Sequence, residues 1–163
     1  MARRPGTCLP GDSMGSVAAP HGFALAADGG EPLCFGEAEF LVKASVETTG
    51  GSFSIIEEIA PLDTPLHVHE HEDELFVVLE GEHEFTVGDT VFDAGPGAVV
   101  FAPRGVPHSH RRVVPRTGRF LTLVSPAGFE GFFRKLSEAE RTGTIGPGAY
   151  ARASERYGIT WLT

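Results

Sequence analysis

The 163-residue sequence is poor in positive charge and in cysteine. Lys and Arg total 13 against 22 Asp and Glu, which gives a formal net charge of −9. No nucleic-acid partner is therefore expected, because binding to phosphates needs clustered basic side chains. The two cysteines, Cys8 and Cys34, are too few for a disulfide scaffold and form no Cys-x-x-Cys pair. A reducing, cytoplasmic setting is the default expectation for such a chain.

Long apolar runs are missing as well. No stretch approaches the roughly 20 apolar residues of a membrane-spanning helix, so no membrane partner is expected. The N-terminus begins with basic residues, but prolines and glycine follow where a signal peptide would have an apolar stretch. We therefore predict a disordered leader over residues 1–18, with either Met1 or Met14 as the true start.

Helical spacing is also absent before residue 129, and the middle of the chain has the pattern of short strands. Gly and Pro separate segments that are rich in β-branched and aromatic residues. The predicted strands are 39–43, 52–60, 74–80, 82–87, 91–94, 98–102, 108–114 and 119–124. Many short strands in succession indicate an all-β sandwich or barrel, which we place at residues 19–126.

The chain from residue 127 to 163 is predicted to be a helical extension that packs on the barrel. Apolar side chains recur three or four residues apart over 128–140, which indicates an amphipathic helix. A second helix is predicted over 147–157, with Pro147 at its start and Gly158 after its end. The phenylalanines of the first helix are interpreted as a cap on the barrel core. A role as a lid over the mouth of the barrel is compatible with that interpretation.

Histidines gather in two short segments that could together hold a metal ion. His67 and His69 alternate on a strand, so both imidazoles point to the same side. Glu74 follows an acidic turn, and an antiparallel neighbour can place its carboxylate beside them. His108 comes from a separate hairpin and adds a fourth ligand. Three imidazoles and a carboxylate suit Fe, Ni, Co, Mn, Zn or Cu(II).

These two segments resemble the two motifs of the cupin superfamily. The first motif is matched by His67, His69, Glu74 and Gly81, and the second by Gly97, Pro103, Gly105 and His108. Pro61 replaces the leading Gly of the first motif, and Arg112 replaces the closing Asn of the second, but neither is a ligand. The resemblance covers about residues 36–126. It implies a single cupin barrel of the jelly-roll (double-stranded β-helix) type, with the metal inside one end, and a homodimer.

Further side chains are expected to surround the metal. If the strand parity is right, an apolar lining is formed by Phe53, Ile55, Phe76, Val78, Phe101 and Phe120. The alternative is that these residues are simply barrel core. His110 has the parity of His108 and could face the cavity, behind a ligand or against the substrate. His71 is predicted to face solvent in its turn, and His83 and His21 to lie on the surface.

Four protein ligands leave coordination positions open on a five- or six-coordinate metal, which is typical of a catalytic site. An apolar cavity around it suits a small aromatic or polyketide-like substrate. The chain is similar to quercetinase-like dioxygenases, and that similarity implies an O2-using oxidoreductase in which Glu74 is also the catalytic base. The alternatives are a non-redox polyketide cyclase or isomerase that uses the metal as a Lewis acid, and a small-molecule-binding protein without turnover. The fold alone does not choose among them.

Overall fold

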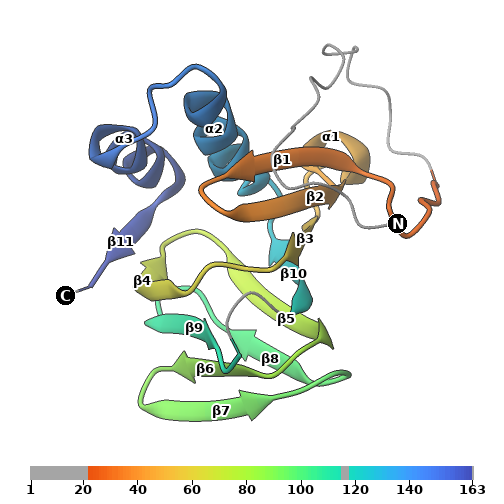
Figure 1. Cartoon of the computed structure of the whole chain (residues 1–163), viewed down its shortest axis with the longest axis vertical. Coiled ribbons are helices and arrows are strands. Elements are labelled where there is room, and N and C mark those ends of the chain that lie inside the picture. The colour runs from red at the N-terminus through yellow and green to blue at the C-terminus, as the bar shows by residue number, and fades with distance from the viewer. Residues whose placement is uncertain (1–21, 115–117, 163) are drawn as a thin grey trace.

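Two antiparallel β-sheets pack against each other, with helices over one end (Figure 1). The structure is a computed structural model that describes residues 22–114 and 118–162. The predicted leader, Met14 and His21 therefore lie outside the described residues. None of the helices within the described ranges is long and apolar enough to cross a membrane.

The two sheets together form a jelly-roll barrel, as the sequence predicts. The larger sheet has the order β1 (Glu31–Phe35), β2 (Ala38–Ala44), β3 (Ser54–Ile59), β10 (Arg119–Ser125), β5 (Asp73–Glu80) and β8 (Val99–Ala102). The smaller sheet has the order β11 (Ile159–Trp161), β4 (Thr64–His69), β9 (His108–Arg112), β6 (His83–Val87) and β7 (Thr90–Ala94). Each predicted strand is present, and its ends agree with the prediction to within two residues.

The interior of the barrel contains two apolar clusters. The first lies between β1, β2, β3 and the helical end, and it includes Phe35, Phe40 and Ile56. The second fills the opposite end, around Phe76, Phe85 and Phe120. Alternate residues of β5 and β10 point inward, as expected for half-buried strands. The first cluster buries residues of the helices, so the extension after the barrel shares its core.

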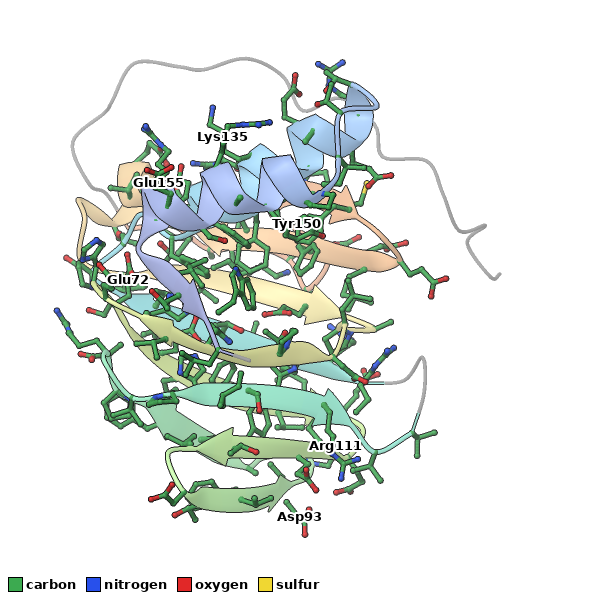
Figure 2. All side chains as sticks on the ribbon, turned by 90° about the vertical axis from the view of Figure 1, so that its left-hand side faces the viewer. Glu72, Asp93, Arg111, Lys135, Tyr150 and Glu155 are labelled. Carbon is green, nitrogen blue, oxygen red and sulfur yellow. The ribbon has the colours of Figure 1, made fainter. Side chains whose placement is uncertain are left out.

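The C-terminal extension consists of two helices and a short strand. The helices α2 (Glu130–Arg141) and α3 (Pro147–Tyr157) lie where the sequence predicts them. Figure 2 shows Tyr150 of α3 pointing toward the barrel, while Lys135 and Glu155 point away from it. A short helix, α1 (Val46–Thr49), joins β2 to β3. The strand β11 is a feature that the sequence prediction missed.

Gly158 allows β11 to follow α3 directly. Its φ of 64° lies in the left-handed region, and a Cβ at this position would lie 2.7 Å from the ring of His71. The chain then runs antiparallel to β4, with Ile159 opposite His69 and Trp161 opposite His67. The extension is therefore hydrogen-bonded to the strand that carries two of the candidate ligands.

The predicted parity of β3 and β8 is wrong. Phe53 precedes β3 and is exposed, and Ile55 lies on the outer face of that strand. In β8, Phe101 is 53% exposed, whereas its neighbours Val100 and Ala102 point inward. In β8 the physical reason is that a run of consecutive apolar residues carries no alternation, so hydrophobicity does not indicate which of its residues face the core. In β3 the alternation of Phe53 and Ile55 with serine indicates the wrong face, because Ser54 is buried and donates a hydrogen bond to Glu130.

His83 was expected on the surface and is instead completely buried. Its ring packs edge-on against Phe120, with 5.3 Å between the ring centroids. Its Nε2 lies 3.2 Å from the carbonyl oxygen of Glu80, and a Cβ at Gly118 would collide with the ring, features that no local sequence pattern signals. His71 is exposed, as predicted.

Candidate metal centre and cavity

The four candidate ligands come from three strands and meet inside the barrel. His67 and His69 lie on β4, Glu74 on β5 and His108 on β9, opposite His67 in the register. One ligand atom of each residue lies within 4.8 Å of the others, and all four side chains are buried. The Glu74 carboxylate lies 3.0 Å from Nε2 of His108 and 3.7 Å from Nε2 of His69. The structure thus brings together all four side chains that the sequence selected.

The outer nitrogen of each imidazole faces an acceptor, which leaves Nε2 directed toward the cluster. Nδ1 of His67 donates to the carbonyl of Pro65 at 2.8 Å, and Nδ1 of His108 donates to that of Val106 at 3.0 Å. Nδ1 of His69 lies 3.6 Å from the Glu72 carboxylate, which is longer than a hydrogen bond. Metal-bound histidines have this arrangement, because the outer contact fixes the ring and its tautomer.

The charges of the cluster also fit a cation. Burial acts to raise the pKa of Glu74, but the three surrounding histidines outweigh it and hold that pKa at about 2. Burial lowers the pKa of His67 to about 4, so its ring is neutral at neutral pH. Burial also acts to lower the pKa of His69, but Glu74 and Glu72 oppose it and the net shift is upward. A carboxylate with so low a pKa is a good ligand and a weak base, which favours the ligand role of Glu74.

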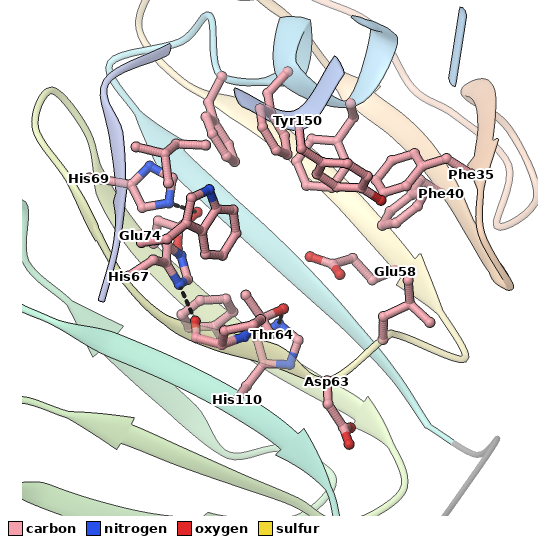
Figure 3. A pocket seen from close by; sticks show the side chains of 18 residues that line it. Phe35, Phe40, Glu58, Asp63, Thr64, His67, His69, Glu74, His110 and Tyr150 are labelled. Carbon is pink, nitrogen blue, oxygen red and sulfur yellow. Dashed lines mark hydrogen bonds and ion pairs between the residues drawn. The ribbon is translucent and has the colours of Figure 1, made fainter. Parts of the chain in front are cut away.

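A cavity of about 250 Å³ lies beside the cluster, between the two apolar clusters of the core (Figure 3). The smaller sheet contributes His67, His69 and His110 to its wall. Aromatic residues enclose most of the rest, namely Phe35, Phe40, Phe76, Phe129, Phe132, Phe133, Tyr150 and Trp161. Phe129, Phe132 and Phe133, at the start of the extension, therefore belong to the core, as interpreted, and also line the cavity.

The predicted lining residues fall into three groups. Phe76 and His110 line the cavity. Val78 and Phe120 are buried in the second apolar cluster, beyond the cavity wall. Phe53, Ile55 and Phe101 are absent from the lining, and this corrects the prediction for those positions. Their places are taken by aromatic residues of the β1–β2 hairpin and of the C-terminal extension, segments outside the two motifs.

Glu72 and Trp161 contribute to the site without having been predicted. The acidic turn at 70–73 reads as a solvated loop, yet Glu72 is buried and its carboxylate faces His69. Trp161 lies with its ring centroid 5.1 Å from that of His67, and its indole nitrogen donates to Ser154 at 2.8 Å. The sequence signal for Trp161 was weak, because a three-residue strand after a helix has no recognisable period.

Glu58 is the most unusual side chain that the sequence prediction missed. It lines the cavity and is only 7% exposed. Its neighbour Glu57 points outward and pairs with Lys43 at 2.9 Å and with Arg119. Burial raises the pKa of Glu58 to about 8. The negative charge of Glu74 also raises this pKa, whereas the hydrogen bond from Thr122 lowers it. The sequence did offer a signal for this buried acid. Glu57 and Glu58 are adjacent in the middle of a predicted strand, and because side chains alternate, one of the two must point inward.

Comparison with known proteins agrees with this geometry. Residues 56–124, which carry all four candidate ligands, match the family model described as the cupin domain. The chain has the cupin fold. The match over these residues supports the cupin superfamily, and the solved structures agree in fold. No curated protein matches the chain.

Several solved cupin-fold structures are similar to this chain. KdgF from a Halomonas species is 15% identical, with a TM-score of 0.59 over 68% of this chain and 99% of that one. An RmlC-like cupin from Shewanella frigidimarina is 17% identical, with a TM-score of 0.55 over 65% of this chain and 93% of that one. Pac13 from Streptomyces, a nucleoside dehydratase, is 12% identical, with a TM-score of 0.53 over 68% of this chain and 88% of that one. At these identities the likeness concerns the fold and not the reaction.

Proposed function

We propose that this cupin is a metal-dependent enzyme that acts on a small aromatic or polyketide-like substrate, and that it is an O2-using dioxygenase. The observation that carries the proposal is a buried cluster of three imidazoles and a carboxylate that opens onto a cavity walled by aromatic rings. A divalent transition metal held there would polarise a substrate oxygen as a Lewis acid and, if redox-active, support reaction with O2.

The side chains around the cluster have separate roles in this proposal. Glu74 balances the charge of the metal and, with a pKa of about 2, stays ionised over the working pH range. The rings of Phe129, Phe132 and Phe133 exclude water from the substrate's apolar body. His110 is held by Thr64, whose Oγ1 lies 2.8 Å from its Nε2, and forms a polar part of the wall. The site therefore has one polar end, at the ligands, and an aromatic chamber.

A non-redox cyclase or isomerase is the second candidate, and Glu58 is the observation that favours it. Such a reaction needs a proton donor or acceptor within reach of the bound substrate. Glu58 offers a carboxyl group in the same cavity whose pKa lies near neutral pH. Pac13 shows that the fold also accommodates a dehydratase, whose reaction needs no oxidant. A small-molecule-binding role without turnover remains the third alternative.

Oxygen uptake decides between the candidates. The protein is loaded separately with Fe, Ni, Mn, Co and Zn, and O2 consumption is followed with the flavonol quercetin as the probe. We expect uptake with a redox-active metal and its loss in His69→Ala, while the exposed His71→Ala behaves like the wild type. Conversion by Zn-loaded protein under nitrogen would establish the non-redox reaction instead. Failure of the wild type to retain near-stoichiometric metal would refute both.

We also propose that two copies of the chain pair through the outer face of the larger sheet. Val99 and Phe101 of β8 are 59% and 53% exposed. They lie opposite Val77 and Leu75 of β5, whose side chains are only half-buried, so the outer face is apolar across neighbouring strands. Contiguous exposed apolar surface is typical of protein interfaces, and a flat sheet face can meet its own copy about a twofold axis.

A further inference from the structure

Glu58 is a buried acid that has no cationic partner among the described residues. The structure gives it one hydrogen bond within residues 22–114 and 118–162, from Oγ1 of Thr122 to Oε1 at 2.9 Å. Its other oxygen has no protein partner in that part of the chain, and the side chain lines the cavity. Figure 3 shows the Glu58 carboxyl pointing into the cavity, below the rings of Phe35 and Phe40. A carboxyl oxygen that faces a cavity and has no protein partner is free to bind a polar group of a ligand.

The position of Glu58 separates it from the metal ligands. Glu58 lies on β3 and Glu74 on β5, and β10 runs between these two strands in the larger sheet. Glu58 is opposite Phe120 of β10, whereas Glu74 is opposite Val124. Glu58 is therefore displaced along the sheet as well as across it, and it does not belong to the cluster of candidate ligands. The wall of the cavity therefore carries a carboxyl group, Glu58, that is separate from the candidate ligands.

We propose that Glu58 is the substrate's second polar contact, donating a hydrogen bond from its carboxyl group to an oxygen of the substrate remote from the metal ligands. The inference rests on the proposed function, because it assumes that the substrate's first oxygen lies at the metal. It deepens that proposal by specifying the substrate class as a flat aromatic molecule with oxygen functions at two separated positions.

The neutral state of the carboxyl supports a donor role. Burial raises the pKa of Glu58 to about 8, so at pH 7 this carboxyl group is protonated in most molecules. A protonated carboxyl can donate to a carbonyl, ether or hydroxyl oxygen. Within residues 22–114 and 118–162, an anionic end such as a carboxylate or phosphate finds no cation at this point of the cavity, because Lys43 and Arg119 pair with Glu57 on the opposite face of the sheet. The site is therefore expected to select neutral oxygen groups.

Calorimetry on Zn-loaded full-length protein under nitrogen tests this contact without turnover. The two probes are 3-hydroxyflavone, which has only the metal-chelating oxygens, and quercetin, which adds hydroxyl groups on the distant rings. We expect quercetin to bind more tightly to the wild type. Glu58→Leu should weaken quercetin about tenfold, the loss typical of one buried hydrogen bond, and leave 3-hydroxyflavone unchanged. Glu58→Gln keeps an N–H donor and should lose less than about threefold.

The controls separate a lost contact from a damaged fold. Glu39→Gln changes an exposed glutamate on the neighbouring strand and should not alter either affinity. Elemental analysis should give the wild-type zinc content for every variant. Unchanged quercetin affinity in a metal-replete Glu58→Leu protein would overturn the proposal for Glu58 and leave the proposed function intact. A loss in Glu58→Gln equal to that in Glu58→Leu would overturn the donor role. Absence of binding of both flavonoids to the wild type would overturn the proposed function and this inference together.

Discussion

Replacing Glu58 by Gln should remove a pH dependence of folding stability whose direction is opposite to that of an ion-paired acid. The pKa of Glu58 is raised from 4.5 to about 8, chiefly by burial. Between these two values the folded protein holds a proton that the unfolded chain has released, so raising the pH favours unfolding. The stabilising contribution of the neutral carboxyl is complete below pH 4.5 and is lost as the pH rises toward about 8.

The size of the effect follows from the separation of the two pKa values. Each pH unit in this window costs the fold about 1.4 kcal/mol. Between about pH 5 and about pH 8 the wild type therefore loses about 4 kcal/mol through Glu58, whereas the amide of the Glu58→Gln variant does not titrate. The difference in unfolding free energy between Glu58→Gln and the wild type should thus shift by about 4 kcal/mol in favour of the variant over this range.

Urea unfolding of metal-free protein, followed by circular dichroism at several pH values, measures this difference. Burial lowers the pKa of His67 to about 4 and of His110 to about 3, so these rings destabilise the fold as the pH falls below about 6.5. Their contribution is common to both proteins and cancels in the difference. Glu39→Gln, on the exposed face of β2, should give no pH-dependent difference. A constant difference between Glu58→Gln and the wild type from pH 5 to 8 would refute the reasoning.

Three further predictions concern the ligands, the core and the outer face. Glu72→Gln removes the charge that faces His69 and should weaken metal binding about 10- to 100-fold, measured by competition with a chelating dye. Leu136→Ala empties a completely buried position of α2 and should cost about 2–5 kcal/mol in urea unfolding, with the exposed Glu138→Ala as the control. Phe101→Glu should convert the proposed dimer to a monomer in light scattering, and a wild-type mass of one chain would rule out the pairing.

Local sequence patterns were sufficient to predict most strands of the barrel and the four candidate ligands, but not β1 or β11. His67 and His69 have the alternation of a strand, and Glu74 and His108 are set by glycine and proline turns near them. These features depend on a few neighbouring residues, whose backbone preferences fix the local geometry. The ends of α3 were predictable for the same reason, since Pro147 and Gly158 bound it.

The cavity, in contrast, was decided by the tertiary structure. The continuous apolar run of β8 gave no phase for Phe101, and the alternation of Phe53 and Ile55 with serine gave the wrong one, because Ser54 is the residue that turns inward. The aromatic walls come from the N-terminal hairpin and from the C-terminal extension, which meet only because the chain folds back on itself. Glu58 is the clearest case. Its identity as an acid on a strand is visible in the sequence, but its burial and its lack of a cation depend on residues far along the chain, such as Thr122. The sequence by itself therefore determined the side chains that could hold a metal, and only the packing of distant strands decided what surrounds them, because burial and pairing are properties of the folded chain.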